Sequence, residues 1–174
     1  MDTMQTSSPS ALPWLALSAV VVAADQVTKQ WINSTIDLCQ GFINSCEKVE
    51  VTSFINLIHL HNEGAAFSFL ADAGGWQRWF IVTLAFGVSI FIIAWLSRLP
   101  RHQYWLAMAL ALILAGAIGN NLSDRLLFGY VIDFIDVYYQ NWHFPTFNVA
   151  DSAISVGAVM LLIDAFFGNS EEES

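Results

Sequence analysis

The run WFIVTLAFGVSIFIIAWL, from Trp79 to Leu96, decides the fold class. It contains no charged residue, and one tryptophan opens the run while a second stands next to its end. A helix needs about 20 mainly apolar residues to cross a bilayer, and tryptophan is enriched where such helices meet water. Three other segments meet the same requirement. The sequence therefore predicts four transmembrane helices, at about residues 12–32, 79–96, 104–122 and 149–167.

The composition of the whole chain agrees with a membrane protein. Of its 174 residues, 56% are hydrophobic and 12% are charged, whereas about 25% are charged in ordinary soluble domains. The net charge of -9 leaves no basic surface that could neutralise phosphates, so we expect no nucleic-acid partner. The length fits a single domain, residues 1–174.

Four spans place both chain ends and the 99–103 loop on one side of the membrane. Arg98 and Arg101 border this loop, and lysine and arginine are enriched on the cytoplasmic side. The charge count therefore favours cytoplasmic termini but leaves the orientation open, because other basic residues would then lie on the outer side, namely Lys29, Lys48, Arg78 and Arg125. The segments at about residues 33–77 and 128–147 are then extracytoplasmic.

The two outer segments differ in character. Residues 48–62, KVEVTSFINLIHLHN, alternate and are rich in β-branched side chains, which favours one or two strands. The run AAFSFL, residues 65–70, predicts another strand after a turn at Glu63 and Gly64. Residues 128–147 mix aromatic and acidic side chains, which predicts a short interfacial helix. The expected fold is a mainly α membrane protein with a small extracytoplasmic β-sheet.

Acidic residues inside or beside apolar spans are expensive, so each is a functional candidate. Asp25 lies four residues before Lys29, and this spacing predicts a structural ion pair on one helix face. We interpret Asp124 as structural and Arg125 as a side chain that holds backbone or substrate oxygens. Asp136 is expected to be a solvated acid at the rim.

Asp133 and Asp151 are the candidates for chemistry. The neighbours of Asp133 are apolar, and apolar surroundings raise the pKa of a carboxyl group. Asn148 and Asp151 have the spacing of a helix capping box, and the helix dipole favours a charged Asp151. Two carboxylates in such different settings can share a proton and activate water, as in aspartic peptidases. Acid pairs also serve ion relays, so an ion or proton carrier stays an alternative.

Other chemistries have less support in the sequence. His59 and His61 alternate on a predicted strand, but no third ligand is evident, so we expect no metal. There is no GxSxG serine motif, no phosphate loop, and no GxGD motif of other intramembrane peptidases. Cys39 and Cys46 are the two cysteines. A disulfide and two free thiols are both compatible with the sequence.

Five short motifs occur in order between about Leu12 and Phe167, and together they are specific: Asp25-Gln26-x-x-Lys29, Asn62-x-Gly64-Ala65-Ala66-Phe67, Asp124-Arg125, Val131-Ile132-Asp133-Phe134 and Phe147-Asn148-x-Ala150-Asp151. In these motifs the chain resembles the bacterial lipoprotein signal peptidases, or signal peptidase II family. The resemblance implies a multi-pass aspartyl peptidase of the bacterial inner membrane, with cytoplasmic termini, an extracytoplasmic β-cradle and no cofactor. We expect it to be a monomer. It implies cleavage of prolipoproteins before a diacylglyceryl-modified cysteine.

The resemblance also implies roles for individual residues. It makes Asp133 and Asp151 the catalytic pair. It gives supporting or substrate-binding roles to a larger set, which comprises Asp25, Lys29, Asn62, Gly64, Arg125 and Asn148. One position departs from the family pattern, because Gly119-Asn120-Asn121-Leu122-Ser123-Asp124 contains one residue more than the family motif. Asn121 has the usual spacing to Asp124, whereas Asn120 follows the glycine, so both stay candidates.

Overall fold

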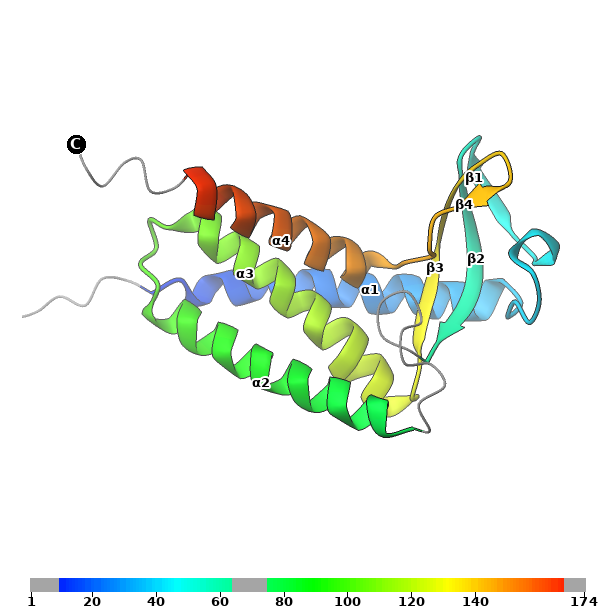
Figure 1. Cartoon of the computed structure of the whole chain (residues 1–174). Helices are drawn as coiled ribbons and strands as arrows, with labels where there is room; N and C mark the ends of the chain where they lie inside the picture. Colours follow the sequence, from blue (N-terminus) through cyan, green and yellow to red (C-terminus); the bar gives the residue numbers. More distant parts are fainter. Residues whose placement is uncertain (1–9, 64–74, 168–174) are drawn as a thin grey trace, which may run out of the picture.

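The helices lie side by side and a small sheet covers one end of them in the computed structural model, which describes residues 10–63 and 75–167 (Figure 1). The helices are α1 (Leu15–Thr35), α2 (Trp76–Arg98), α3 (Tyr104–Gly116) and α4 (Val149–Phe167). A π-helix, Ala117–Arg125, continues α3. The start of α1 and the end of α4 lie at the end of the molecule opposite the sheet.

Three helical stretches are long and apolar enough to cross a membrane, namely Trp76–Arg98, Tyr104–Arg125 and Val149–Phe167. Each overlaps one of the predicted spans. The helix at the first predicted span, α1, has 21 residues, but its second half carries Asp25, Gln26, Lys29 and Gln30. These polar residues lower its hydropathy below that of the other three.

Small residues allow α3 and α4 to pack closely. A Cβ on Gly116 would lie 2.6 Å from the Ala150 carbonyl oxygen, and one on Gly157 would lie 2.7 Å from the Ala109 carbonyl oxygen. Ala115, the preceding residue of α3, is fully buried. Close approach through small residues is how helices associate inside lipid, where apolar burial drives little.

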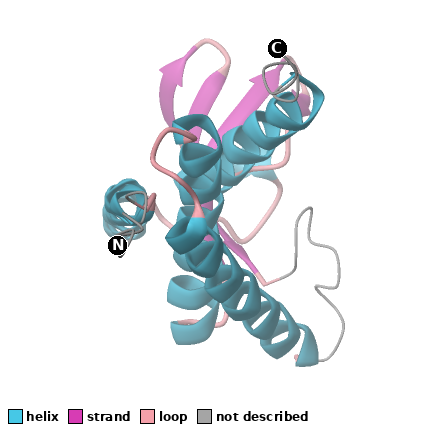
Figure 2. Ribbon diagram, turned by 90° about the vertical axis from the view of Figure 1, so that its left-hand side faces the viewer, coloured by secondary structure: helices cyan, strands magenta, loops and turns pink. Residues whose placement is uncertain are grey.

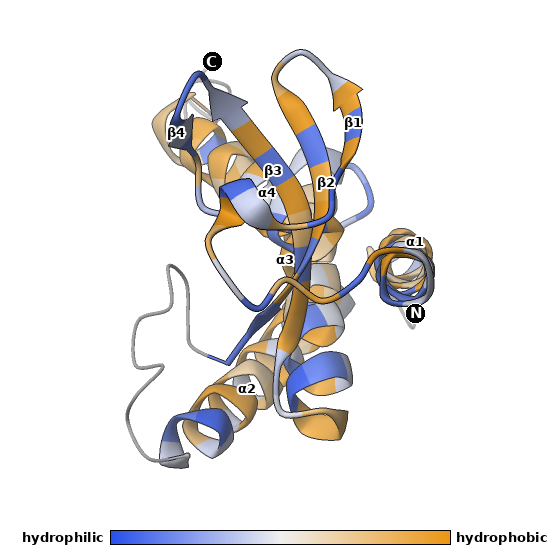
Figure 3. Cartoon of the chain, turned by 90° about the vertical axis from the view of Figure 1, so that its right-hand side faces the viewer, coloured by the Kyte–Doolittle hydropathy of each residue, from blue (hydrophilic) through white to orange (hydrophobic). Residues whose placement is uncertain are grey.

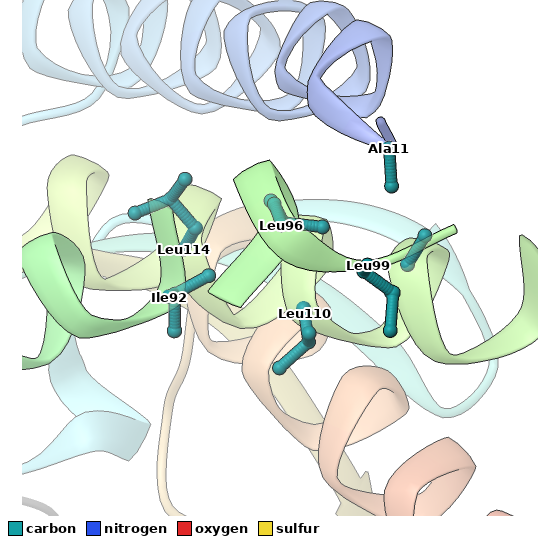
Figure 4. Packing of buried hydrophobic residues seen from close by; sticks show 7 residues of the cluster. Ala11, Ile92, Leu96, Leu99, Leu110 and Leu114 are labelled. Carbon is teal, nitrogen blue, oxygen red and sulfur yellow. The ribbon is translucent and has the colours of Figure 1, made fainter. Parts of the chain in front are cut away.

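A cluster of buried apolar residues joins the helices at the end away from the sheet: Ala11, Ile92, Leu96, Leu99, Ala107, Leu110 and Leu114. Figure 4 shows side chains from α2, α3 and the start of the described chain converging there. The Ala11 amide also donates to the Leu99 carbonyl oxygen at 2.9 Å. This cluster holds the helices together at the end of the molecule away from the sheet.

The sheet has four antiparallel strands in the order β1-β2-β3-β4. They are β1 (Val49–Thr52), β2 (Ile55–Asn62), β3 (Val131–Tyr139) and β4 (Trp142–His143). The strands predicted within residues 48–62 are confirmed as β1 and β2. The strand predicted for residues 65–70 lies outside the described residues.

The predicted interfacial helix within residues 128–147 is wrong, because β3 and β4 occupy this segment. β3 pairs with β2 and places Ile132 and Phe134 against Ile32 and Ile36 near the end of α1. Alternating hydrophilic and hydrophobic residues are visible along β2 and β3 (Figure 3). β3 is a strand because it pairs along its length with β2. It is buried on both faces, and its two acids are three residues apart.

Seen from the far ends of the helices, the strands lie behind them (Figure 2), and the buried cluster around Ile32 and Phe134 holds the sheet to α1. A register shift between Leu57 and Leu60 gives β2 one residue more than β3. Such bulges re-aim side chains next to active sites. After this one, Leu60 lies opposite Asp133 and Asn62 lies opposite Val131. Cys39 and Cys46 form a disulfide in the loop between α1 and β1, so they are not the two free thiols that the sequence also allowed.

Candidate active site

Asp133 lies on β3 and is 4% exposed. Its carboxylate accepts two hydrogen bonds from side-chain amides, from Asn62 Nδ2 at 2.9 Å and from Asn148 Nδ2 at 2.8 Å. Asn62 reaches it from the neighbouring strand and Asn148 from the start of α4. The strand thus places a carboxylate where two other elements can contact it.

Asp151 lies in the first turn of α4. Its backbone N–H donates to Asn148 Oδ1 at 2.9 Å, and its Oδ2 accepts the Asn148 backbone N–H at 3.2 Å. These reciprocal bonds confirm the predicted capping box. Its Oδ1 also accepts a hydrogen bond from Asn120 Nδ2 at 2.7 Å. Asp151 therefore sits at a helix N-terminus with two N–H donors directed at it.

Asn148 joins the two acids. Its side chain is fully buried, with Nδ2 donating to Asp133 and Oδ1 accepting from the Asp151 backbone. Both carboxylates line one pocket of about 680 Å³. The other residues that line it are Asn62, Ile81, Asn120, Asn121, Arg125, Val131, Phe144, Pro145, Thr146, Phe147, Ser152, Ile154, Ser155 and Val156. The pocket is mainly apolar, with its polar groups gathered around the acid pair.

The carboxyl group of Asp133 has a strongly altered proton affinity. Burial raises its pKa from 3.8 to about 7, and the negative charge of Asp151 acts in the same direction. The hydrogen bonds from Asn62 and Asn148, and the positive charge of Lys29, lower the pKa and offset part of this rise. The raised pKa predicted from its apolar neighbours is confirmed. This carboxyl group therefore keeps its proton to a much higher pH than a solvent-exposed aspartate does.

A buried ionic network lies behind the acid pair. Lys29 Nζ contacts Asp25 Oδ2 at 2.7 Å, which confirms the predicted pair, and Asp124 Oδ2 at 2.6 Å. Its third contact, at 2.7 Å, is with Asn120 Oδ1. An ammonium group has three N–H donors, so these three acceptors match it. The network connects α1 to the π-helix and, through Asn120, to Asp151.

Asp25 extends this network to α4. Its Oδ1 accepts the backbone N–H of Ala150 at 2.9 Å, one residue before Asp151. Gly119 leaves room for this carboxylate, since a Cβ there would lie 2.9 Å from Asp25 Oδ2. Gln26 Nε2 donates to Asp124 Oδ1 at 2.8 Å. The network therefore links α1 to the π-helix and to the start of α4.

The π-helix decides between the two candidate asparagines. A π-helix accommodates an extra residue inside an α-helix and is frequent at functional sites. Here it spans Ala117–Arg125. Asn120 faces Asp151 and Lys29, whereas Asn121 Oδ1 accepts a hydrogen bond from Arg125 Nε at 3.2 Å. The residue next to the acid pair is therefore Asn120, and the extra residue is absorbed by the wider helical turn.

Arg125 is buried and borders the pocket. Its Nη1 donates to the backbone carbonyl oxygen of Glu63 at 3.0 Å, so the expectation that it holds a backbone oxygen is confirmed. Through this contact it anchors the end of β2 next to Asn62. Gly64, the other residue expected in this segment, lies outside the described residues.

The structure also places Asp136 and the two histidines of β2. The prediction that Asp136 is a solvated rim acid is wrong, because it is 1% exposed and contacts Asn56 and His143. Pairing of β3 with β2 and β4 brings these partners together, and Asn56 comes from 80 residues away in the sequence. His59 and His61 lie with their Nε2 atoms 3.2 Å apart.

Sequence reasoning also missed one wall of the pocket. Residues 144–147, Phe-Pro-Thr-Phe, line it from the segment between β4 and α4. Two aromatic rings around a proline just before the capping box were the available signal. Their position depends on the pairing of this segment with β3, for example Phe147 with Ile135.

The chain matches known proteins along most of its length. The family model described as Signal peptidase (SPase) II matches residues 17–167. A lipoprotein signal peptidase of Acinetobacter baumannii is 55% identical over 159 residues, covering 91% of this chain and 86% of that relative. One from Pseudomonas syringae pv. tomato is 48% identical over 165 residues, covering 94% of this chain and 91% of that relative.

Solved structures agree with the sequence relatives. A bacterial membrane enzyme determined by the in meso method has a TM-score of 0.76 to this chain at 29% identity, and the match covers 93% of this chain and 94% of that one. With the apolar helices, these likenesses indicate a bacterial membrane protein with peptidase function. The family match and the relatives show that the chain belongs to the signal peptidase II family.

Proposed function

We propose that this chain is an intramembrane aspartyl endopeptidase that removes the signal peptide from prolipoproteins. Its cut would fall just before the diacylglyceryl-modified cysteine. The observation that carries the proposal is the pairing of Asp133 and Asp151 in one pocket, with Asn148 hydrogen-bonded to both residues. Curated relatives named lipoprotein signal peptidase support the substrate class.

The chemistry follows from the different settings of the two acids. Asp151, at a helix N-terminus with N–H donors from Asn120 and Asn148, acts as the base and takes a proton from water. Asp133, whose pKa is about 7, keeps a proton that polarises the scissile carbonyl and later passes to the leaving amine. A coupled pair titrates as a unit, so the two roles belong to one dyad.

The membrane arrangement we propose has four spans, with α1 as the first. Asp25 and Lys29 are buried against partners inside the protein, whereas the outward-facing residues Val20, Val27 and Trp31 are apolar and exposed. Charges in a span are tolerated when they face the bundle interior and are paired. A helix with such a polar inner face can therefore cross the bilayer beside the other three.

In this arrangement both termini are cytoplasmic, and the sheet and acid pair lie at the outer face. The loop between α2 and α3, which Arg98 and Arg101 border, lies at the end of the helices opposite the sheet, in accord with the enrichment of basic residues on the cytoplasmic side. The substrate helix would enter from the bilayer, with its diacylglycerol among apolar pocket residues such as Ile81, Ile154 and Val156. We propose a monomer, because the side chains that hydrogen-bond to the dyad among the described residues can assemble within a single chain.

The test is a cleavage assay in detergent with a prolipoprotein that carries the diacylglyceryl cysteine, run beside its unlipidated form. Asp133→Asn and Asp151→Asn are expected to abolish cleavage while the proteins stay folded. Asp164→Asn, on the same helix as Asp151 but outside the pocket, is the matched control and should keep wild-type activity. Mass spectrometry of the products locates the cut. Normal turnover by Asp133→Asn would refute the proposal.

A further inference from the structure

Asp136 is a second buried carboxylate on β3, and it has no part in the proposed chemistry. It lies three residues after Asp133 on β3, and side chains alternate along a strand, so the two acids point to opposite faces of the sheet. Asn56 Nδ2 donates to its Oδ2 at 3.1 Å, and His143 Nδ1 lies 2.7 Å from its Oδ1. A buried carboxylate is costly without such partners. Asp136 therefore connects the strands on which Asn56 and His143 lie.

His143 continues the chain of contacts to a loop outside the sheet. Its Nε2 lies 3.1 Å from Asn44 Oδ1. Imidazole can serve two neighbours at once, and the asparagine amide can face it with either its oxygen or its nitrogen. Tyr138 stacks on the same imidazole, with ring centroids 5.7 Å apart. His143 is thus fixed by contacts on both ring nitrogens and on its face.

Asn44 belongs to a loop that is closed covalently. It lies in a short 3-10 turn, Ile43–Ser45, between the disulfide partners Cys39 and Cys46. The Cys39 backbone N–H donates to the His59 carbonyl oxygen at 2.9 Å, which ties the loop to β2. A cross-link removes alternative loop conformations. The loop therefore presents Asn44 to His143 from a fixed base.

The far end of this chain of contacts is a wall of the pocket. His143 directly precedes Phe144, and residues 144–147 line the pocket that holds the dyad. β4 is only two residues long. Its continuation is held to β3 by the Phe144 N–H to the Val137 carbonyl oxygen at 2.8 Å and by the Phe147 N–H to the Ile135 carbonyl oxygen at 3.2 Å. Because β4 is so short, the side-chain contacts of His143 also help to hold this segment in place.

We infer that Asn44, His143 and Asp136 are positioning residues for this peptidase. Together with the loop closed by Cys39 and Cys46, they hold the 144–147 wall at the distance from the dyad that the substrate requires. The inference rests on the proposed function. It assigns the cluster an effect on substrate binding, because the wall borders the pocket while the cluster lies on the other face of the sheet from Asp133.

The first test needs no enzymatic activity. In the full chain in detergent, hydrogen exchange of the Phe144 and Phe147 amides is compared between wild type, Asn44→Ala and Ser45→Ala. Ser45 is the matched control, because its hydroxyl donates to the Phe42 carbonyl oxygen within the loop. Exchange at both amides is expected to be several-fold faster in Asn44→Ala only. Unchanged exchange in Asn44→Ala would overturn the inference.

The second test measures kinetics on the lipidated prolipoprotein. Losing one hydrogen bond of this kind corresponds to a rise in KM of about three- to tenfold, and kcat should stay within twofold. The double variant Cys39→Ser/Cys46→Ser is expected to behave in the same way. Adding Asn44→Ala to it should bring no further rise, because both changes release the same anchor. A fall in kcat at unchanged KM would contradict the positioning role.

The two tests separate failure of the inference from failure of the proposed function. If the wild-type chain cleaves no prolipoprotein, the proposed function is refuted, and the exchange measurement still decides whether the cluster holds the wall. If exchange rises but KM does not, the wall is anchored by the cluster without serving the substrate. That result would refute the positioning role.

Discussion

Lys29 Nζ lies 2.7 Å from Asn120 Oδ1, and this contact fixes which way the Asn120 amide faces. With its oxygen directed at the ammonium group, its nitrogen is free to donate to Asp151 at 2.7 Å. Lys29 thus acts on the acid pair without contacting the substrate pocket. These contacts distinguish Asn120 from its neighbour Asn121, whose Oδ1 accepts a hydrogen bond from Arg125 Nε.

Asn120→Ala is therefore expected to lower kcat about tenfold or more, since a hydrogen bond to a charged group contributes about 1.5–3 kcal/mol. Asn121→Ala is the matched control, one residue along the same π-helix, and we expect a change within about threefold. Steady-state kinetics on the lipidated substrate compares the two. An equal loss in both variants would show that the amide facing Asp151 has no special role.

Lys29→Met should destabilise the protein strongly. It leaves Asp25 and Asp124 buried without their cation, and breaking one partner of a buried ion pair costs about 3–5 kcal/mol. Thermal unfolding in detergent measures the effect, with the exposed Lys48→Met as the control. Combining Lys29→Met with Asp124→Asn should recover part of the loss, because one of the stranded charges is removed. Wild-type stability of Lys29→Met would disprove this account of the network.

The pKa of Asp133, about 7 in the folded protein against 3.8 for the free group, gives a pH dependence with a definite sign. The folded state binds this proton more tightly than the unfolded state, so the associated stability is present below pH 4 and is lost as the pH rises toward 7. A shift of this size corresponds to at most about 4 kcal/mol. Asp133→Asn cannot titrate, so its stability relative to wild type should increase between pH 4 and pH 8.

The same proton predicts the pH profile of activity. If Asp133 is the acid, kcat/KM falls as the pH rises through about 7, because the carboxyl group loses the proton that it must donate. Initial rates in buffers of constant ionic strength, from pH 5 to 9, measure this limb. A rate that stays level up to pH 9 would contradict the assignment of Asp133 as the acid.

Gly157→Ala tests the close packing of α3 and α4. An added Cβ would lie 2.7 Å from the Ala109 carbonyl oxygen, so the helices must separate, at a cost of about 1–3 kcal/mol. Gly87→Ala on α2 is the control, because nothing lies within 4 Å of a Cβ there. We expect a lower unfolding temperature for Gly157→Ala only. Equal behaviour of the two variants would refute the packing argument.

Features governed by local spacing could be predicted from the sequence. The pair Asp25 and Lys29 depends only on a separation of four residues in a helix, and the reciprocal bonds of Asn148 and Asp151 depend on a separation of three at a helix start. The helices follow from long apolar runs. Such patterns need no knowledge of the rest of the chain.

Features that depend on distant partners could not be predicted. β3 forms because β2, about 75 residues earlier in the chain, offers it a pairing edge, and the mixed aromatic and acidic composition alone suggested a helix. Asp136 is buried because Asn56 and His143 cover it. The choice between Asn120 and Asn121 needed the π-helix, whose wider turn has no reliable signature in residue types.

The partners of α1 also bear on how the nascent protein enters the membrane. Its charged pair is synthesised early, but the groups that complete its contacts, on Asn120, Asp124 and Ala150, leave the ribosome about a hundred residues later. Until then Asp25 and Lys29 have only each other, and the first helix is the most polar of the four. If α1 is the first span, as we propose, its buried charges must enter the membrane before most of the groups that pair with them have been made.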